Sequence, residues 1–287
     1  MRIGIVGSRG QLGSALSRLI GMERVVGLDL PDFDATNPDC LTQIASENID
    51  CLINTSAFND VDRAESDTDE AFRLNAFAPV QLSSYCAARN IRFVTFSTDY
   101  VFGNRVSSGH GRPWTETDEA LPLSVYGVSK WAGERLVLNR DPRAYVIRTC
   151  GLYGTHRSSR PRKNFVDLML QLGKEGKTIR VVSDQIVAPT STESLAATVL
   201  EFLGSEPPGG IYHMASSGEC SWYEFAAAIF RIRGIAPALV PVTQAEYGAK
   251  AKRPSYSVLS QVKIHGLGLS LPHWEMSLKE YLGNSPF

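Results

Sequence analysis

The stretch M-R-I-G-I-V-G-S-R-G-Q-L-G, residues 1–13, decides the expected fold. A short apolar strand runs into three glycines, Gly7, Gly10 and Gly13, and an amphipathic helical pattern follows them. In a dinucleotide site such glycines allow a tight turn, a close approach of backbone to phosphate, and close packing of the helix. The helix N-terminus also offers N–H groups and a positive dipole end to a pyrophosphate. The stretch therefore predicts a nucleotide-binding βαβ unit in preference to a merely tight turn.

Two charged residues near the glycines point to different cofactors. Asp29 closes the second expected strand, where an acidic residue meets the adenosine ribose and favours NADH. Arg9 lies inside the loop, where its guanidinium could pair with the 2′-phosphate of NADPH. Asp29 is also compatible with a plain turn before Pro31. The sequence predicts NADPH or NADH and leaves the preference open.

Beyond this loop, β-rich runs alternate with helical patterns through the first half of the chain. Such alternation predicts an α/β fold: a Rossmann-type, doubly wound parallel sheet with right-handed crossovers and helices on both faces. Strands are expected at Ile3–Val6, Arg24–Leu28, Cys51–Asn54, Arg92–Phe96 and Ala144–Ile147.

The second half is less regular. We expect residues 1–150 to form the nucleotide-binding domain, completed by about 179–204, with a sheet strand at Ile179–Val182 and a helix at Ser191–Leu203. Residues 151–178 and 205–287 would form a smaller, mostly helical substrate-binding domain. Its features are an exposed basic loop at 157–163, a break at the P-P-G-G of 207–210, and helices at Trp222–Ile232 and Met276–Leu282.

Composition argues against several classes of partner. A net charge of −1 gives no basic field for nucleic acid or an anionic membrane, and no apolar run approaches a membrane span. The sequence begins without a signal-peptide pattern, so a cytoplasmic protein is expected. The cysteines are odd in number and form no C-x-x-C pair, which argues against a disulfide framework or a zinc site. No other metal site is indicated, and Mg²⁺ remains open. The cysteines are Cys40, Cys51, Cys86, Cys150 and Cys220.

The segment S-V-Y-G-V-S-K at 124–130 places Tyr126 and Lys130 four residues apart. At the start of a helix, both side chains would share one face. A phenol titrates near pH 10, so a neighbouring ammonium would help it give and regain a proton at neutral pH. By itself the pair is equally typical of a surface helix, and the segments around it must decide.

The segment F-S-T-D-Y-V-F-G at 96–103 supplies that context, because it begins at the end of an expected strand. The carboxyl ends of parallel strands form the ligand crevice, so a Thr98 hydroxyl there could bind a substrate carbonyl beside Tyr126. Ser97 and Thr98 could instead only cap the strand end. Asn75, in the preceding helix, could organise the backbone or a water near the site, or be a plain helix residue.

With these motifs the sequence resembles the dTDP-4-dehydrorhamnose reductase family of extended short-chain dehydrogenases, over nearly the whole chain. The resemblance rests on several motifs in order. They are G-S-R-G-Q-L-G at 7–13, I-N-T-S-A-F-N-D-V-D-R-A-E at 53–65, F-S-T-D-Y-V-F-G at 96–103, V-Y-G-V-S-K at 125–130, R-T-C-G-L-Y-G at 148–154, K-N-F at 163–165, V-V-S-D-Q-I-V-A-P-T at 181–190 and R-P-x-x-S at 253–257.

The resemblance implies reduction of a 4-keto nucleotide sugar by NADPH or NADH, with a catalytic triad of Thr98, Tyr126 and Lys130. The nucleotide sugar is the implied partner, and a homodimer is compatible with the family. The implied cofactor contacts come from Gly7, Gly10, Gln11, Leu12, Asp29, Ala57 and Lys130, beside Arg9 and Gly13 of the same loop. The implied substrate contacts come from Thr98, Asp99 and Tyr126, with Arg253 near the nucleotide phosphates.

The chain departs from the family's pattern at three places. Gly151 stands where the family usually has a tryptophan that contributes to the sugar pocket, and Asn59 stands where threonine is common. The D-Q-I-V-A-P-T element, residues 184–190, lacks its usual glycine. Two alternatives therefore stay open: a reductase of a different nucleotide sugar, and a regulatory subunit that binds NADP(H) without turnover, as in the regulatory β subunit of methionine adenosyltransferase.

Overall fold

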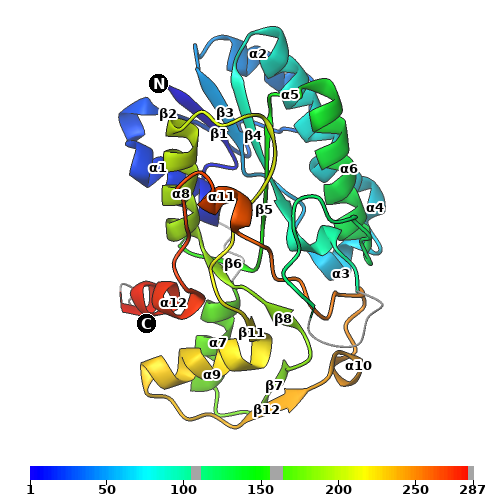
Figure 1. Cartoon of the computed structure of the whole chain (residues 1–287), viewed down its shortest axis with the longest axis vertical. Helices are drawn as coiled ribbons and strands as arrows, with labels where there is room; N and C mark the ends of the chain where they lie inside the picture. Colours follow the sequence, from blue (N-terminus) through cyan, green and yellow to red (C-terminus); the bar gives the residue numbers. More distant parts are fainter. Residues whose placement is uncertain (105–110, 156–163, 284–287) are drawn as a thin grey trace.

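The computed structural model describes residues 1–104, 111–155 and 164–283, and a six-stranded parallel sheet lies at its centre (Figure 1). The strand order is β10-β5-β4-β3-β1-β2. The order reverses between β1 and β3, and such a switch point forms a ligand crevice at the carboxyl ends of the strands. The strands are β1 (Ile3–Val6), β2 (Val25–Leu28), β3 (Cys51–Asn54), β4 (Arg92–Thr98), β5 (Tyr145–Thr149) and β10 (Gly210–His213).

Helices cover both faces of this sheet, as expected for a doubly wound fold (Figure 1). One apolar core joins α1 (Gln11–Ile20) and α8 (Thr192–Gly204) to the sheet, together with α11 (Val262–His265). A second core, on the opposite face, involves α2 (Cys40–Ala45), α5 (Ala78–Ala88) and α6 (Val125–Arg140). Shorter elements connect these helices and strands: the 3-10 helices Met22–Arg24 and Asp99–Val101, α3 (Val61–Ala64), α4 (Thr68–Phe72) and the π-helical turn Arg73–Phe77.

The remaining segments gather beyond the carboxyl ends of the strands, in the lower part of Figure 1. Their apolar core joins α7 (Phe165–Lys174), α9 (Trp222–Arg233) and α12 (Trp274–Gly283). Short strand pairs and one further helix complete this region. They are β6 (Leu152–Tyr153) with β9 (Thr190–Ser191), β7 (Ile179–Val182) with β12 (Leu239–Val242), β8 (Ile186–Val187) with β11 (Cys220–Ser221), and α10 (Gln244–Tyr247).

Side-chain caps explain where the main helices of the second half begin. Ser191 accepts a hydrogen bond from the Glu193 amide at the start of α8. Ser221 and Glu224 form a reciprocal capping box at the start of α9. A cap of this kind satisfies amide groups that have no partner inside the helix. The predicted helices at 191–203, 222–232 and 276–282 therefore match the observed ones to within one or two residues.

The expected placement of Ile179–Val182 in the main sheet is wrong. This strand pairs with Leu239–Val242, and Gly210–His213 completes the main sheet beside β5. Arg180 is exposed while its neighbours in the strand are buried, so β7 is covered on one face only. Central parallel strands are buried on both faces, and an alternating pattern signals a peripheral strand. β10 was missed because it directly follows the P-P-G-G break.

Three further expectations concern the cysteines, membrane-spanning helices and the basic loop. The five cysteines are free thiols, and all of them are buried. Among the described residues, no helix is both long and apolar enough to cross a bilayer. The expected loop at 157–163 lies outside the described residues.

Candidate active site

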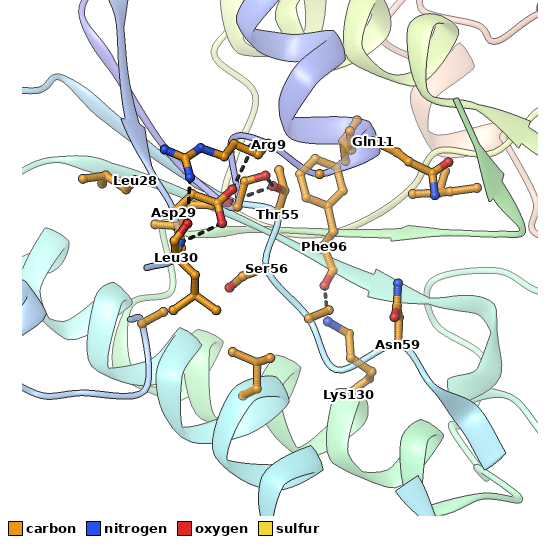
Figure 2. A pocket seen from close by; sticks show the side chains of 18 of the residues that line it. Arg9, Gln11, Leu28, Asp29, Leu30, Thr55, Ser56, Asn59, Phe96 and Lys130 are labelled. Atoms are coloured by element: carbon orange, nitrogen blue, oxygen red, sulfur yellow. Dashed lines mark hydrogen bonds between the residues drawn. The ribbon is translucent and has the colours of Figure 1, made fainter. Parts of the chain in front are cut away.

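A cavity of about 1140 Å³ lies at the carboxyl ends of the parallel strands (Figure 2). It is bordered by the glycine loop, by the ends of β2 to β5, and by α6. Three of the predicted catalytic, cofactor-binding and substrate-binding residues do not line it: Gly13, Asp99 and Arg253. The residues that do line it are Gly7, Arg9, Gly10, Gln11, Leu12, Asp29, Ala57, Thr98, Tyr126 and Lys130.

The glycine loop is held tightly against its neighbours. The Gly7 amide donates to the Leu28 carbonyl at 2.8 Å, and Gly7 has a φ of +79°, which favours glycine. A Cβ at Gly13 would lie 2.2 Å from the Gly7 carbonyl oxygen, so α1 packs directly on the loop. Gly10 caps α1 without a side-chain hydrogen bond. The amides at the start of α1 are thus left for a ligand, as an anion site at a helix N-terminus requires.

Asp29 and Arg9 are joined to each other at the edge of this loop (Figure 2). The Asp29 carboxylate accepts from the backbone amides of Arg9 at 2.7 Å and Leu30 at 2.8 Å. The Arg9 guanidinium donates to the Leu30 carbonyl at 2.9 Å and lies 3.8 Å from Asp32. The carboxylate is therefore fixed by backbone, whereas the exposed guanidinium is held only by a carbonyl and an ion pair at the surface.

Three buried polar atoms in the cavity wall are unsatisfied within the described residues: Gln11 Oε1, Ser97 Oγ and Thr149 Oγ1. Buried polar groups nearly always have a hydrogen-bond partner. Their presence around a large cavity fits a polar ligand such as a dinucleotide. Sequence reasoning missed Thr149, although its position directly at the end of β5 was a signal for the crevice.

Lys130 and Tyr126 lie on one face of α6, as their spacing predicts. Ser124 caps this helix by accepting from the Gly127 amide at 3.2 Å. The Lys130 ammonium is buried and donates to the Phe96 carbonyl at 2.6 Å (Figure 2). Burial lowers the pKa of Lys130 to about 8, although Glu134 one turn later opposes the shift. The ammonium is thus anchored to the end of β4 and is easily deprotonated.

The pKa of Tyr126 differs from the expectation. Burial raises it to about 12, although the interaction with the Thr98 hydroxyl lowers it in part. Lys130 is not among the groups that shift the pKa of Tyr126, and its ammonium donates to the Phe96 carbonyl. A raised pKa keeps the phenol protonated at neutral pH, which is the form a proton donor needs.

Thr98 is tied to two buried groups behind the cavity wall. Its hydroxyl donates to Asp99 Oδ1 at 3.0 Å and accepts from the Tyr100 amide at 3.2 Å. The Cys150 thiol donates to the other Asp99 oxygen at 3.1 Å. Asp99 is 2% exposed and reaches the cavity only through Thr98.

Asn75 proves to be more than a plain helix residue. Its amide group exchanges two hydrogen bonds with the Phe58 backbone, at 2.9 and 3.0 Å, and donates to the Ser129 hydroxyl at 3.0 Å. Ser129 in turn donates to the Tyr126 carbonyl at 2.8 Å. Asn75 therefore fixes the loop after β3, which lines the cavity, to the helix that carries Tyr126.

Arg253 pairs with Asp62 at the start of α3. The shortest contact is 2.7 Å, and a second guanidinium nitrogen reaches the other carboxylate oxygen at 3.2 Å. Burial raises the pKa of Asp62, but the hydrogen bonds from Arg253 and from the Ala251 amide outweigh it and lower that pKa. The guanidinium also neighbours Tyr100, whose ring meets the Tyr126 ring edge-on at 5.9 Å. Arg253 is thus one aromatic ring away from the cavity.

Gly151 lines the cavity with a φ of +51°, and a tryptophan stands directly behind it. A Cβ at Gly151 would lie 3.2 Å from the tip of the Trp222 indole and 3.4 Å from the Pro189 backbone. Trp222 begins α9 and packs on Phe165 at 4.7 Å between ring centres. A residue larger than glycine at 151 would therefore compete with the indole for space.

Comparisons with known proteins agree in one family. The family model of the RmlD substrate binding domain matches residues 1–286. The chain is similar to the spore coat polysaccharide biosynthesis protein SpsK of Bacillus subtilis, with 41% identity over 81% of this chain and 78% of that protein. It is also 34% identical to a dTDP-4-dehydrorhamnose reductase of Aggregatibacter actinomycetemcomitans, over 97% of each chain.

Solved structures give the same result. A dTDP-4-dehydrorhamnose reductase from Clostridium acetobutylicum superposes with a TM-score of 0.91 and 36% identity, over 99% of both chains. The dTDP-4-dehydrorhamnose reductase of Bacillus anthracis, solved in complex with NADP, superposes equally well at 32% identity, again over 99% of both chains.

Proposed function

The chain belongs to the RmlD substrate binding domain family, and from this membership we propose that it is an NAD(P)H-dependent oxidoreductase of a 4-keto nucleotide sugar. The proposed reaction converts dTDP-4-dehydro-L-rhamnose to dTDP-L-rhamnose. The names of full-length relatives and the NADP complex of one of them support this assignment. The proposal places the activity in the cytoplasm and is compatible with a homodimer.

The observation that carries the proposal is the convergence of two features on one cavity. The glycine loop, with a free helix N-terminus, lines one end, while Thr98, Tyr126 and Lys130 line the wall beside it. Neither feature is specific alone. Together they supply a place for a dinucleotide and a proton donor next to it, as carbonyl reduction requires.

When bound, a reduced nicotinamide would supply the hydride for the substrate carbonyl carbon. Tyr126 protonates the carbonyl oxygen, and its high pKa ensures that it carries the proton at neutral pH. Thr98 holds the same oxygen and favours the charge that develops on it. Lys130, anchored to the Phe96 carbonyl, orients the cofactor ribose.

Arg253 is proposed to meet the nucleotide phosphates. A guanidinium carries five N–H donors, and the pairing with Asp62 leaves some of them for a phosphate. We further propose that residues 1–150 form the nucleotide-binding domain, to which 192–204 and 210–213 are added by their packing on the sheet. The segments around α7, α9 and α12 would bind the sugar nucleotide.

Gly151 favours a second candidate, a reductase of a different nucleotide-linked keto sugar. At this position the cavity wall is a glycine, and the Trp222 indole packs directly behind it. A wall of this shape could accept a sugar with other substituents than those of the rhamnose precursor. The hydride and proton chemistry would be unchanged.

The proposal is tested by following NADPH and NADH absorbance with purified protein and enzymatically generated dTDP-4-dehydrorhamnose. Rapid oxidation with formation of dTDP-L-rhamnose is the expected result. Oxidation only with other keto sugars would move the assignment to the second candidate. Tight cofactor binding without oxidation of any nucleotide sugar would instead indicate a regulatory subunit and overturn the enzymatic proposal.

A further inference from the structure

The hydrogen bonds that Thr98 already makes limit which hydrogen bonds its hydroxyl can form with a substrate. A hydroxyl has one donor and two acceptor positions. In the structure the donor goes to Asp99 Oδ1, and one acceptor receives the Tyr100 amide. The remaining acceptor position can only accept a hydrogen bond, from Tyr126 or from a ligand. While Asp99 is an ionised carboxylate, Thr98 therefore has no hydrogen to offer a substrate carbonyl.

Asp99 is in surroundings that favour its neutral form. Burial raises the pKa of this carboxyl, although the neighbouring Ser257, Cys150 and Thr98 side chains lower it in part. The titratable groups coupled to Asp99 are Tyr100 on its own element, Tyr126 on α6 and Cys150 after β5. Of the nearest cations, Arg253 is paired with Asp62 and Lys130 donates to Phe96. Neither is directed at the Asp99 carboxyl.

Protonation of Asp99 reverses the hydrogen bond to Thr98. The carboxylic acid then donates to Thr98 Oγ1, both acceptor positions of the hydroxyl are filled, and its hydrogen turns toward the cavity. We propose, building on the reductase function above, that Asp99 is a positioning residue: its acid form aims the Thr98 hydrogen at the substrate oxygen, and the Cys150 thiol holds that carboxyl in place. The ionised form leaves Tyr126 as the single donor to that oxygen.

The asparagine variant copies the acid form. In Asp99→Asn, the Cys150 thiol can donate to the amide oxygen, which directs the amide N–H groups at Thr98. Wild-type reduction should fall as the pH rises and Asp99 ionises, at a pH above the ordinary carboxyl value of about 3.9. Asp99→Asn should lose this fall while keeping the one due to Lys130 near pH 8. Asp99→Ala should lose about 100-fold in kcat, the cost of one oxyanion donor.

The contact of Cys150 with Asp99 predicts the direction in which the pH profile of activity should shift. The thiol lowers the pKa of Asp99, so Cys150→Ala should move the activity loss to higher pH, whereas Cys150→Ser keeps a donor and should restore the wild-type profile. Cys220→Ala removes a buried thiol from β11 and serves as the control with an unchanged profile. Asp141→Asn, another buried carboxyl, is the matching control for Asp99→Asn.

The decisive experiment combines pH profiles of kcat for these variants with infrared spectroscopy of the protein without substrate. The expected results are the changes above and a carboxylic acid C=O band, at pH values below the fall in activity, that Asp99→Asn removes. A wild-type profile in Asp99→Asn, or no such band, would overturn the inference. The infrared band is independent of turnover, so failure of the reductase function itself, seen as no oxidation by the wild type, remains distinguishable.

Discussion

At one end of the cavity the glycine loop is fixed mainly by contacts within the first βαβ unit, with one hydrogen bond from Thr55 after β3, whereas at the other end the catalytic side chains are fixed by distant segments. Gly7 bonds to Leu28 and Arg9 to Asp29, all within the first thirty residues. At the catalytic end, Lys130 is anchored to Phe96, and Asn75 joins the loop after β3 to α6. The cofactor end is therefore determined mostly by local contacts, while the catalytic end depends on segments far apart in the chain.

The largest effect should follow from removing the anchor of the catalytic end. Lys130→Met loses both the cation and the bond to the Phe96 carbonyl, so kcat should fall by about 10³-fold, within the usual range for acid–base groups. Lys263→Met is the matched control, because Lys263 also donates to a backbone carbonyl, that of Ile211, away from the cavity. Equal losses in both variants, measured by steady-state kinetics, would mean that only folding was disturbed.

A smaller effect is expected at the local end. A Cβ at Gly13 would collide with the Gly7 carbonyl, so Gly13→Ala must displace the loop at a cost of roughly 1–3 kcal/mol, about 5- to 150-fold in cofactor Kd. Gly204→Ala in α8 is the control, since nothing lies within 4 Å of its added Cβ. Cofactor titration by fluorescence checks both. Unchanged affinity in Gly13→Ala would contradict the loop's assigned role.

A substitution at Trp222 tests whether the cavity wall around Gly151 contributes to binding of the nucleotide sugar. Trp222→Phe withdraws the indole tip from behind Gly151, and the KM for the nucleotide sugar should rise by about two- to tenfold, as expected for one aromatic contact, with little change in the KM for NADPH. Trp274→Phe removes an indole from the same apolar core and serves as the control. Equal changes in both substrates' KM values would indicate general loosening of that core.

The smallest effect concerns cofactor preference. Asp29→Asn removes the charge and keeps one of the two oxygen acceptors, because the Arg9 and Leu30 amides donate to different carboxylate oxygens. We expect kcat/KM with NADPH to rise relative to NADH by about fivefold, the value of roughly 1 kcal/mol between charges in water. Arg9→Gln should shift the ratio the other way. A ratio that is unaffected by either change would show that neither residue meets the 2′ position.

The sequence predicted the local end well because its determinants lie within a few residues of each other. The strand, the three glycines and α1 all stand where the pattern of residues 1–13 indicates. Tyr126 and Lys130 were likewise found from their helical spacing, and the observed Ser124 cap fixes the helix start.

Contacts between distant segments could not be predicted from the sequence. Nothing near Cys150 indicates that its thiol meets Asp99, and nothing near Arg253 indicates Asp62 as its partner. The raised pKa of Tyr126 also depends on burial that only the assembled fold provides. The misplaced strand Ile179–Val182 has the same cause, because its partner Leu239–Val242 lies some sixty residues away.

The most direct test of the account compares wild type with Tyr126→Phe, measuring cofactor Kd and NADPH oxidation on the same samples with the keto sugar. The account predicts rapid oxidation by the wild type, a loss of about 10²–10⁴-fold in Tyr126→Phe, and nearly equal cofactor affinity in both. Turnover by Tyr126→Phe at the wild-type rate would contradict the assignment of Tyr126 as proton donor.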